Sequence, residues 1–328
     1  MRNMQGEHFQ PYGDAYKPAK EDGDDILPFF IKGRVLPKEV IPLRPIAEET
    51  MVTAIDVSSI KLGETTMGIL CAIRGAIVWR ENGRYKYLRL GPFPFHITEE
   101  NRREIYGLFR QYSFERPEDS TAPSLLKIQA RMGTLFERWL QMCVSCSCRH
   151  NLILWDGSLT AGTTDSPVSV MSHLLGTARN GMNSVLAFSK TSRLRLLGHW
   201  IVDLLWECQP PCLLEIGRGF HLSTGPMHCL GDIYIAKLAP RGCSFRLDID
   251  RRISHEERVE AAQRLLGNDV LHQGYPETLR LAHILSTFTA SEVIGIQRYV
   301  AQEWGLKIVE RPNMRRLLFG PFGKGPED

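Results

Sequence analysis

Asn151-Leu-Ile-Leu-Trp-Asp-Gly-Ser-Leu159 is the segment around which this chain is organised. It holds a short, continuous apolar run, Leu152–Trp155, and a run of this kind that ends at Asp-Gly predicts a strand buried on both faces. Asp156 then stands at the carboxyl end of the strand, the edge at which open α/β sheets bind ligands. Asp-Gly is also a common turn dipeptide, so a plain turn at Asp156-Gly157 is the alternative interpretation.

A second stretch has the same form. Residues 53–59, Thr-Ala-Ile-Asp-Val-Ser-Ser, are an apolar strand that carries one acid, Asp56, followed by small hydroxyl side chains. A carboxylate inside a buried strand is costly unless it is paired or binds a cation. Asp56 and Asp156 therefore suggest two carboxylates that converge on a metal ion.

A third acid stands between these two strands in the sequence. Residues 123–142 begin with Pro-Ser and continue with apolar residues at helical spacing, which predicts a helix. Glu137 lies beside Phe136, close to the apolar stripe, where a charged residue is unexpected. Glu137 is thus the third candidate ligand.

An ordered set of motifs resembles the NurA nuclease family over roughly residues 50–310. The motifs are Ala54-Ile-Asp-Val-Ser58, Leu135-Phe-Glu137, Leu154-Trp-Asp-Gly-Ser-Leu159, Phe188-Ser-Lys190, and Gly274-Tyr-Pro276 with Ala282-His283. The resemblance implies an α/β fold, an RNase H-like mixed sheet flanked by helices, with additional helical and β elements. It also implies manganese-dependent cleavage of DNA by a homodimer that docks on HerA, a hexameric DNA-translocating ATPase.

The resemblance adds His283 to the three acids as a metal ligand, although a lone helical histidine is more often a packed or surface residue. An imidazole among carboxylates favours Mn²⁺ or Zn²⁺ over Mg²⁺. We predict a two-ion manganese site with Mg²⁺ as the alternative. Lys190 is expected to pair with a phosphate, and Tyr275 to stack on a base or position a phosphate. A surface role for Lys190 and a packing role for Tyr275 are the alternatives.

The net charge of only +3 gives no overall basic footprint, so a nucleic-acid groove has to be local. One candidate group is near the metal site, and another is near the C-terminus; solvated surface charge is the alternative for each. The first group is Lys190, Arg193 and Arg195, and the second is Arg311, Arg315, Arg316 and Lys324.

No stretch approaches the roughly 20 apolar residues of a membrane span, and the N-terminus has no apolar signal core. We therefore expect a cytoplasmic protein with no membrane contact. The eight cysteines include a cluster at Cys143, Cys146 and Cys148 and a pair at Cys208 and Cys212. A C-x-x-C spacing is compatible with zinc or an iron–sulfur cluster, but free thiols in a reducing compartment are the preferred interpretation.

The chain is predicted to comprise an N-terminal arm and wrapping segment at 1–49, a nuclease domain at 50–310, and a C-terminal tail at 311–328 that contacts a partner or a second copy. Within the domain, hairpin-linked strands come first and helices follow. Strands are expected at 51–58, 67–79, 84–90, 184–188, 231–238 and 243–249, and helices at 98–112, 123–142, 166–180, 192–206, 254–266 and 277–304.

The leading functional hypothesis is a metal-dependent exonuclease and single-strand endonuclease, acting on single- and double-stranded DNA in end processing, repair or phage defence. One rival is an inactive interaction subunit of a translocase complex. A second is a phosphotransferase of RNase H topology, which needs glycine-rich phosphate hairpins; residues 58–66 offer only Gly63. No G-x-x-x-x-G-K-[ST] phosphate loop and no G-x-S-x-G nucleophile motif is present.

Overall fold

The structure is a computed structural model of the whole chain, and it describes residues 40–113, 122–190, 192, 194–196, 199–216 and 228–309. Residues 1–39 of the predicted N-terminal arm therefore lie outside the described residues. The whole predicted C-terminal tail, 311–328, lies outside them as well. None of the helices in the described ranges is long and apolar enough to cross a membrane.

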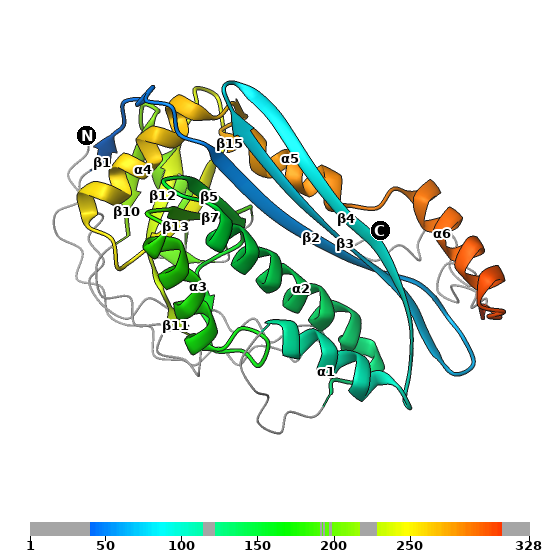
Figure 1. The fold of residues 1–328 in the computed structure, drawn as a ribbon. Helices are drawn as coiled ribbons and strands as arrows, with labels where there is room; N and C mark the ends of the chain where they lie inside the picture. The colour runs from blue at the N-terminus through cyan, green and yellow to red at the C-terminus, as the bar shows by residue number, and fades with distance from the viewer. Residues whose placement is uncertain are drawn as a thin grey trace.

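A nine-stranded mixed sheet forms the centre of the molecule, in the order β1-β10-β12-β13-β7-β5-β2-β3-β4 (Figure 1). β2, β5 and β7 are parallel neighbours, and the other pairs are antiparallel. The strands are β1 Val40–Pro42, β2 Val52–Glu64, β3 Gly68–Glu81, β4 Arg84–Thr98, β5 Leu152–Asp156, β7 Ser184–Ser189, β10 Cys212–Glu215, β12 Gly231–Lys237 and β13 Ser244–Asp250.

The segment β4-β3-β2-β5-β7 has the strand order of an RNase H-like sheet, because a three-stranded antiparallel meander is continued by two parallel strands. The apolar runs around Asp56 and Asp156 form β2 and β5, as the sequence predicts. The third strand of the meander is longer than the predicted 84–90 and continues to Thr98. The mixed α/β class and the RNase H-like core are thus confirmed.

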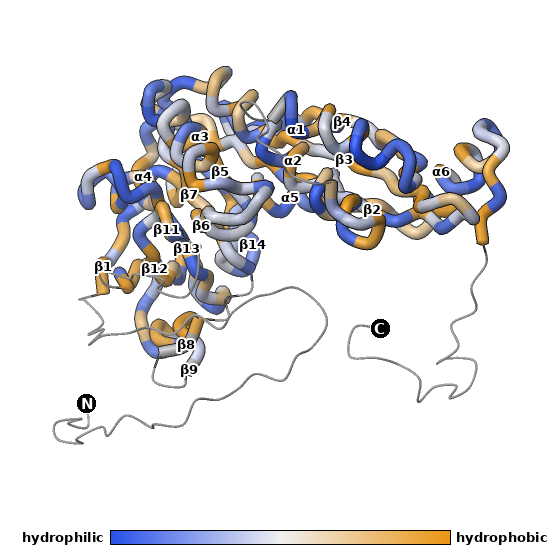
Figure 2. The backbone as a smooth tube through the Cα atoms, turned by 90° about the horizontal axis from the view of Figure 1, so that it is seen from below, coloured by the Kyte–Doolittle hydropathy of each residue, from blue (hydrophilic) through white to orange (hydrophobic). Residues whose placement is uncertain are grey.

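Helices cover both faces of this sheet. α1, α2 and α3 lie along one face, and α4 and α5 along the other (Figure 1). α4 opens with a hydrophilic stretch, coloured blue in Figure 2, and its first turn is closed by a capping box between Ser254 and Glu257. The helices are α1 Arg102–Ser113, α2 Leu125–Ser147, α3 Val168–Asn180, α4 His255–Asn268, α5 Glu277–Ser286 and α6 Ala290–Glu303.

Alternation along the strands divides the core into two layers. Ala54 and Leu154 point to the α4 and α5 face, whereas Ile55 and Trp155 point to the α2 and α3 face. Asp56 has the parity of Ala54, and Asp156 has the parity of Leu154. The two acids therefore face α5.

The prediction of one helix over 277–304 is wrong, because the chain forms two helices there. Thr289 is the N-cap of α6: its hydroxyl accepts from the backbone N–H of Glu292, and the Glu292 carboxylate accepts from the backbone N–H of Thr289. Arg74 donates to the Thr287 carbonyl at 3.1 Å, which holds the break against β3. The side chain of Phe288 is buried at the break, under the Arg74 guanidinium.

The helix predicted over 192–206 is also wrong. This segment contains two short strands, β8 Arg195–Leu196 and β9 His199–Trp200, and the short 3-10 helix η1 Ile201–Leu205. Its apolar residues Leu194, Ile201 and Leu205 are buried against β10 and β12. Apolar spacing alone does not separate a helix from a folded hairpin whose burial is decided by tertiary contacts.

Four further two-residue strands form two small two-stranded sheets. β6 pairs with β11 next to the loop after β5, and β14 pairs with β15 ahead of α5. α5 begins directly after this hairpin, at Glu277. These strands are β6 Thr160–Ala161, β11 His228–Cys229, β14 Leu271–His272 and β15 Tyr275–Pro276.

Candidate metal centre

The candidate site lies where the pairing of the parallel strands β2 and β5 ends. Ile55 of β2 is in register with Trp155 of β5, and this is the last paired position of the two strands. Asp56 and Asp156, the next residues, therefore stand side by side at the carboxyl edge of the parallel strands. Ligands of open α/β sheets bind at this edge.

Helix α5 adds an imidazole to the two carboxylates. Nδ1 of His283 lies 3.3 Å from Oδ2 of Asp56, and the imidazole is half-exposed. One ligand atom each from Asp56, Asp156 and His283 lies within 4.8 Å of the others. Among the described residues, these three form the one group of acids, histidines or cysteines that could hold a metal ion. The group contains no cysteine.

Asp56 is buried, with 8% of its surface exposed. Burial is the main cause that raises its pKa above the ordinary value, and the neighbouring charge of Asp156 raises it further. The hydroxyl of Ser286, one turn beyond His283 on α5, donates a hydrogen bond to Asp56 and opposes this rise. An ionised Asp56 at neutral pH is thus poised to gain from a cation.

Glu137 lies on α2, which covers the opposite face of the sheet, and it is not part of the group within 4.8 Å. Burial raises its pKa to about 7, Arg138 lowers it, and the charges of Asp56 and Asp156 raise it again. Its carboxylate accepts a hydrogen bond from Gln141 at 3.1 Å. The structure thus brings Glu137 into the electrostatic field of the two aspartates rather than into direct contact with them.

Lys190 follows β7, the strand next to β5, and reaches back to the site. Its Nζ lies 2.6 Å from Oδ2 of Asp156 and 5.9 Å from the centroid of the Tyr275 ring. The expected partner of Lys190 was a phosphate, and in this structure the partner is a carboxylate of the candidate metal centre. Both side chains of this pair are partly exposed.

Tyr275 precedes α5 and is buried, with edge-to-face contacts to Phe188 and Phe245. The ring is therefore packed inside the protein, which excludes stacking on a base in this conformation and agrees with the alternative of a packing role. Its hydroxyl is buried without a hydrogen-bond partner. Burial, followed by the charges of Asp156 and Asp56, raises its pKa, so the hydroxyl stays protonated.

Several residues that hold the site were not identified from sequence. The Asp248 carboxylate accepts from the backbone N–H of Leu159 at 3.0 Å and forms two hydrogen bonds of 2.7 Å with Arg246. This buried pair anchors the loop that follows Asp156. Gly157 has φ +104°, a conformation that favours glycine, and its N–H donates to Phe188 O at 2.8 Å.

Ser286 and Gln141 are two further residues that sequence reasoning did not assign to the site. Ser286 was recognisable only as a residue one turn after His283, and Gln141 only as one turn after Glu137. Arg193, a candidate DNA contact, lies outside the described residues. The four basic residues of the C-terminal group lie outside them as well.

The donor set fits a divalent cation. Two carboxylates and one imidazole converge without a cysteine, and hard or borderline divalent ions accept this combination of oxygen and nitrogen ligands. Among the described residues, Lys190 and His283 form ion pairs with the two aspartates. Lys190 is the one of these that carries a permanent positive charge. A divalent ion would offset the remaining negative charge.

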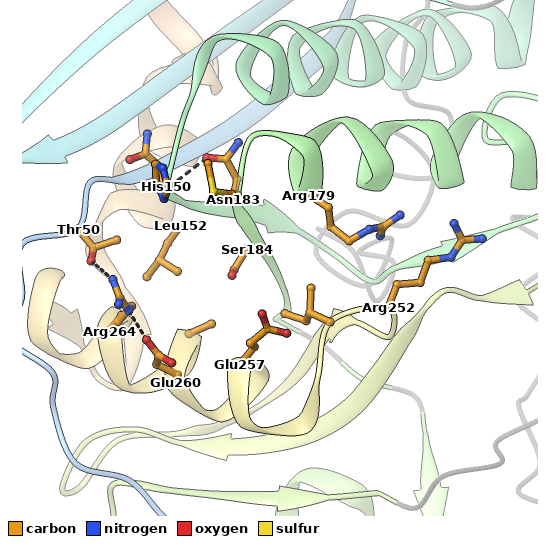
Figure 3. A pocket seen from close by; sticks show the side chains of 14 residues that line it. Thr50, His150, Leu152, Arg179, Asn183, Ser184, Arg252, Glu257, Glu260 and Arg264 are labelled. Atoms are coloured by element: carbon orange, nitrogen blue, oxygen red, sulfur yellow. Dashed lines mark hydrogen bonds and ion pairs between the residues drawn. The ribbon is translucent and has the colours of Figure 1, made fainter.

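A cavity of about 470 Å³ lies at the other edge of the sheet, where β5 and β7 begin (Figure 3). Arg179, Arg252 and Arg264 surround it together with Glu257 and Glu260. Arg264 pairs with Glu260, and Arg179 pairs with Asp250. The cavity has mixed charge, and it includes none of the three residues of the candidate metal centre.

The backbone resembles solved nuclease structures. The crystal structure of the NurA nuclease from Sulfolobus solfataricus matches with a TM-score of 0.53 at 18% identity, over 81% of this chain and 88% of that chain. A structure of NurA bound to dAMP and manganese matches with a TM-score of 0.45 at 8% identity, over 79% and 90% of the two chains. Endonuclease V from Bacillus subtilis matches with a TM-score of 0.37 at 10% identity, over 82% and 88%.

The first of these likenesses shows that the chain has the NurA fold, as its motifs predict. The other two have TM-scores below 0.5. No protein-family model matches the sequence, and no curated protein is significantly similar to it.

Proposed function

We propose that the chain is a metal-dependent deoxyribonuclease that hydrolyses phosphodiester bonds. The observation that carries the proposal is the convergence of Asp56, Asp156 and His283 at the carboxyl edge of an RNase H-like sheet. The NurA fold supports the same reaction class, although fold alone does not define function.

Asp56, Asp156 and His283 would hold the metal, and Glu137 would complete a two-ion site. When bound, divalent ions supply Lewis acidity toward the scissile phosphate and lower the pKa of water. We propose Mn²⁺ as the ion because of the imidazole, with Mg²⁺ as the alternative. The three clustered groups account for a single ion, and Glu137 would be the added ligand of the second.

The residues of the chain have distinct parts in this proposal. In a site with one ion, Glu137 stands apart from the three ligands with its pKa raised to about 7, so it is suited to accept a proton from the attacking water; in a site with two ions it would be a ligand. Tyr275 packs under Lys190 at the same edge, with its ring between Phe188 and Phe245 and its hydroxyl buried. Gln141 orients Glu137, and Ser286 orients Asp56.

We further propose that the protein acts as a homodimer with a HerA-like hexameric ATPase and takes both single- and double-stranded DNA. The motif resemblance supports this assembly. End processing in repair or phage defence is the corresponding biological role, and we propose the cytoplasm as the place of action.

Cleavage of end-labelled single- and double-stranded DNA with Mn²⁺, Mg²⁺ or a chelator tests the proposal. We expect cleavage with Mn²⁺, none with the chelator, and none in Asp56→Asn or Asp156→Asn. Asp203→Asn, at an exposed acid on η1, is the matched control and should cleave normally. Wild-type protein that binds Mn²⁺ without cutting DNA would favour the inactive-subunit hypothesis, and nucleotide hydrolysis without DNA cleavage would favour a phosphotransferase.

A further inference from the structure

Lys190 occupies the position next to Asp156 that a cation would take. Its ammonium is 2.6 Å from Oδ2 of Asp156, which is one of the three clustered ligands. The pair joins the ends of the neighbouring parallel strands β5 and β7, so it is built into the sheet edge rather than formed by a distant side chain. The side chain of Lys190 is exposed, and its Nζ lies 5.9 Å from the centroid of the buried Tyr275 ring.

A divalent ion and this ammonium compete for the same negative charge. Two cations at one carboxylate repel each other strongly at the short distances of a partly buried site. An ion that binds Asp56, Asp156 and His283 would therefore weaken the contact between Lys190 and Asp156. The released side chain stays tethered at the end of β7, close to the edge where a scissile phosphate would bind.

We propose that Lys190 is a built-in counter-ion of the metal-free site, which divalent metal displaces from Asp156 so that its ammonium becomes available to the DNA phosphate. This inference rests on the proposed function and adds an order of events to it. Metal loading comes first, and a strong grip on the phosphate follows. Lysine serves this purpose well because its ammonium is a compact charge on a flexible stem.

The proposal predicts opposite effects of one substitution on two kinds of binding. Removing the competing cation with Lys190→Met should tighten Mn²⁺ binding by roughly two- to tenfold, which is the range expected for loss of one partly exposed charge pair. The same change should weaken DNA binding by the metal-loaded protein and reduce the salt slope of that binding by about one. A simple structural role of Lys190 would not tighten metal binding.

Lys61 is a matched control elsewhere in the fold. Its Nζ lies 2.9 Å from Oε1 of Glu64, and the exposures of that pair, 45% and 27%, resemble those of Lys190 and Asp156, 37% and 23%. Glu64 is outside the group of candidate ligands. Lys61→Met should therefore leave Mn²⁺ affinity unchanged.

The test is calorimetric titration of Mn²⁺ into metal-free wild type, Lys190→Met, Lys190→Arg and Lys61→Met. DNA binding is measured as a function of salt on phosphorothioate DNA, which resists cleavage. We expect tighter Mn²⁺ binding only in Lys190→Met. In that variant, DNA binding should depend less steeply on salt concentration than in the wild type, and only when Mn²⁺ is present. Lys190→Gln replaces Lys190→Met if circular dichroism shows that the methionine variant is unfolded.

Equal or weaker Mn²⁺ binding in the folded Lys190→Met protein would overturn the inference. If the wild type still bound Mn²⁺ and Asp156→Asn did not, the proposed metal centre would stand, and only the role of Lys190 as its counter-ion would be lost. A wild type that binds no divalent ion would overturn both.

Discussion

Nδ1 of His283 lies 3.3 Å from Oδ2 of Asp56, although 227 residues separate the two in the sequence. The contact joins helix α5 to strand β2 on the face of the sheet that also carries Asp156. Because Asp56 is buried and His283 is half-exposed, the strand supplies the fixed ligand and the helix supplies the one that closes the site toward solvent. Each of these residues can be tested separately.

His283→Ala should lower Mn²⁺ affinity by at least about tenfold, the lower end of the loss seen when even an outer-shell partner of a metal is removed. The reason is the loss of one of the three clustered ligands. His173→Ala, at an exposed position on α3, is the control and should bind Mn²⁺ as the wild type does. Calorimetry measures both, and equal affinities in the two variants would remove His283 from the metal centre.

Ser286→Ala should reduce metal affinity and cleavage together, by about 10- to 100-fold. The Ser286 hydroxyl donates to Asp56 and is fully buried, so the alanine leaves the carboxylate free to rotate and raises its pKa further. Ser291→Ala on α6 removes an exposed hydroxyl and serves as the control. Unchanged Mn²⁺ affinity in Ser286→Ala would mean that the hydroxyl only packs α5 against β2.

Glu137 should make the stability of the metal-free protein depend on pH. Burial raises its folded pKa from 4.5 to about 7, so its contribution to stability is complete below pH 4.5 and is lost as the pH rises through about 7. Glu137→Gln should flatten this part of the curve of unfolding free energy against pH. Urea unfolding at several pH values measures it, and a curve in the variant as steep as in the wild type would show that Glu137 titrates normally.

Asp56→Asn should keep the fold while it abolishes Mn²⁺-dependent cleavage. The amide can still accept the hydrogen bond of Ser286, and it removes an ionised group whose pKa is raised mainly by burial. Because burial raises the pKa of Asp56, its ionised form is disfavoured in the folded protein, and at neutral pH without metal the variant should be at least as stable as the wild type. Thermal unfolding in chelator measures this, and a large loss of stability would assign Asp56 a structural role.

The positions of Asp56 and Asp156 could be predicted from sequence because each acid interrupts or ends an apolar strand, and the strand pattern is local. The break at Thr287–Thr289 was not predicted, since apolar spacing continues through it and the capping box was not recognised. The contact of Asp248 with the Leu159 backbone was also missed, because it joins residues 89 apart whose meeting depends on the whole sheet order. Sequence periodicity predicts which face of a helix or strand is apolar. It does not predict which polar side chain forms a hydrogen bond with a neighbouring helix or strand.

The separation of α5 from α6 has a consequence for the electric field at the metal centre. A helix carries a partial negative charge at its C-terminal end, which stabilises nearby cations within its last turn. Because α5 ends at Ser286, its last turn contains His283, and the negative end of its dipole is directed to the same place as the carboxylates. One continuous helix to Trp304 would have carried that end several turns away. The capping box of Thr289 and Glu292 begins a separate helix at Ala290, so the dipole of α5 ends within one turn of His283.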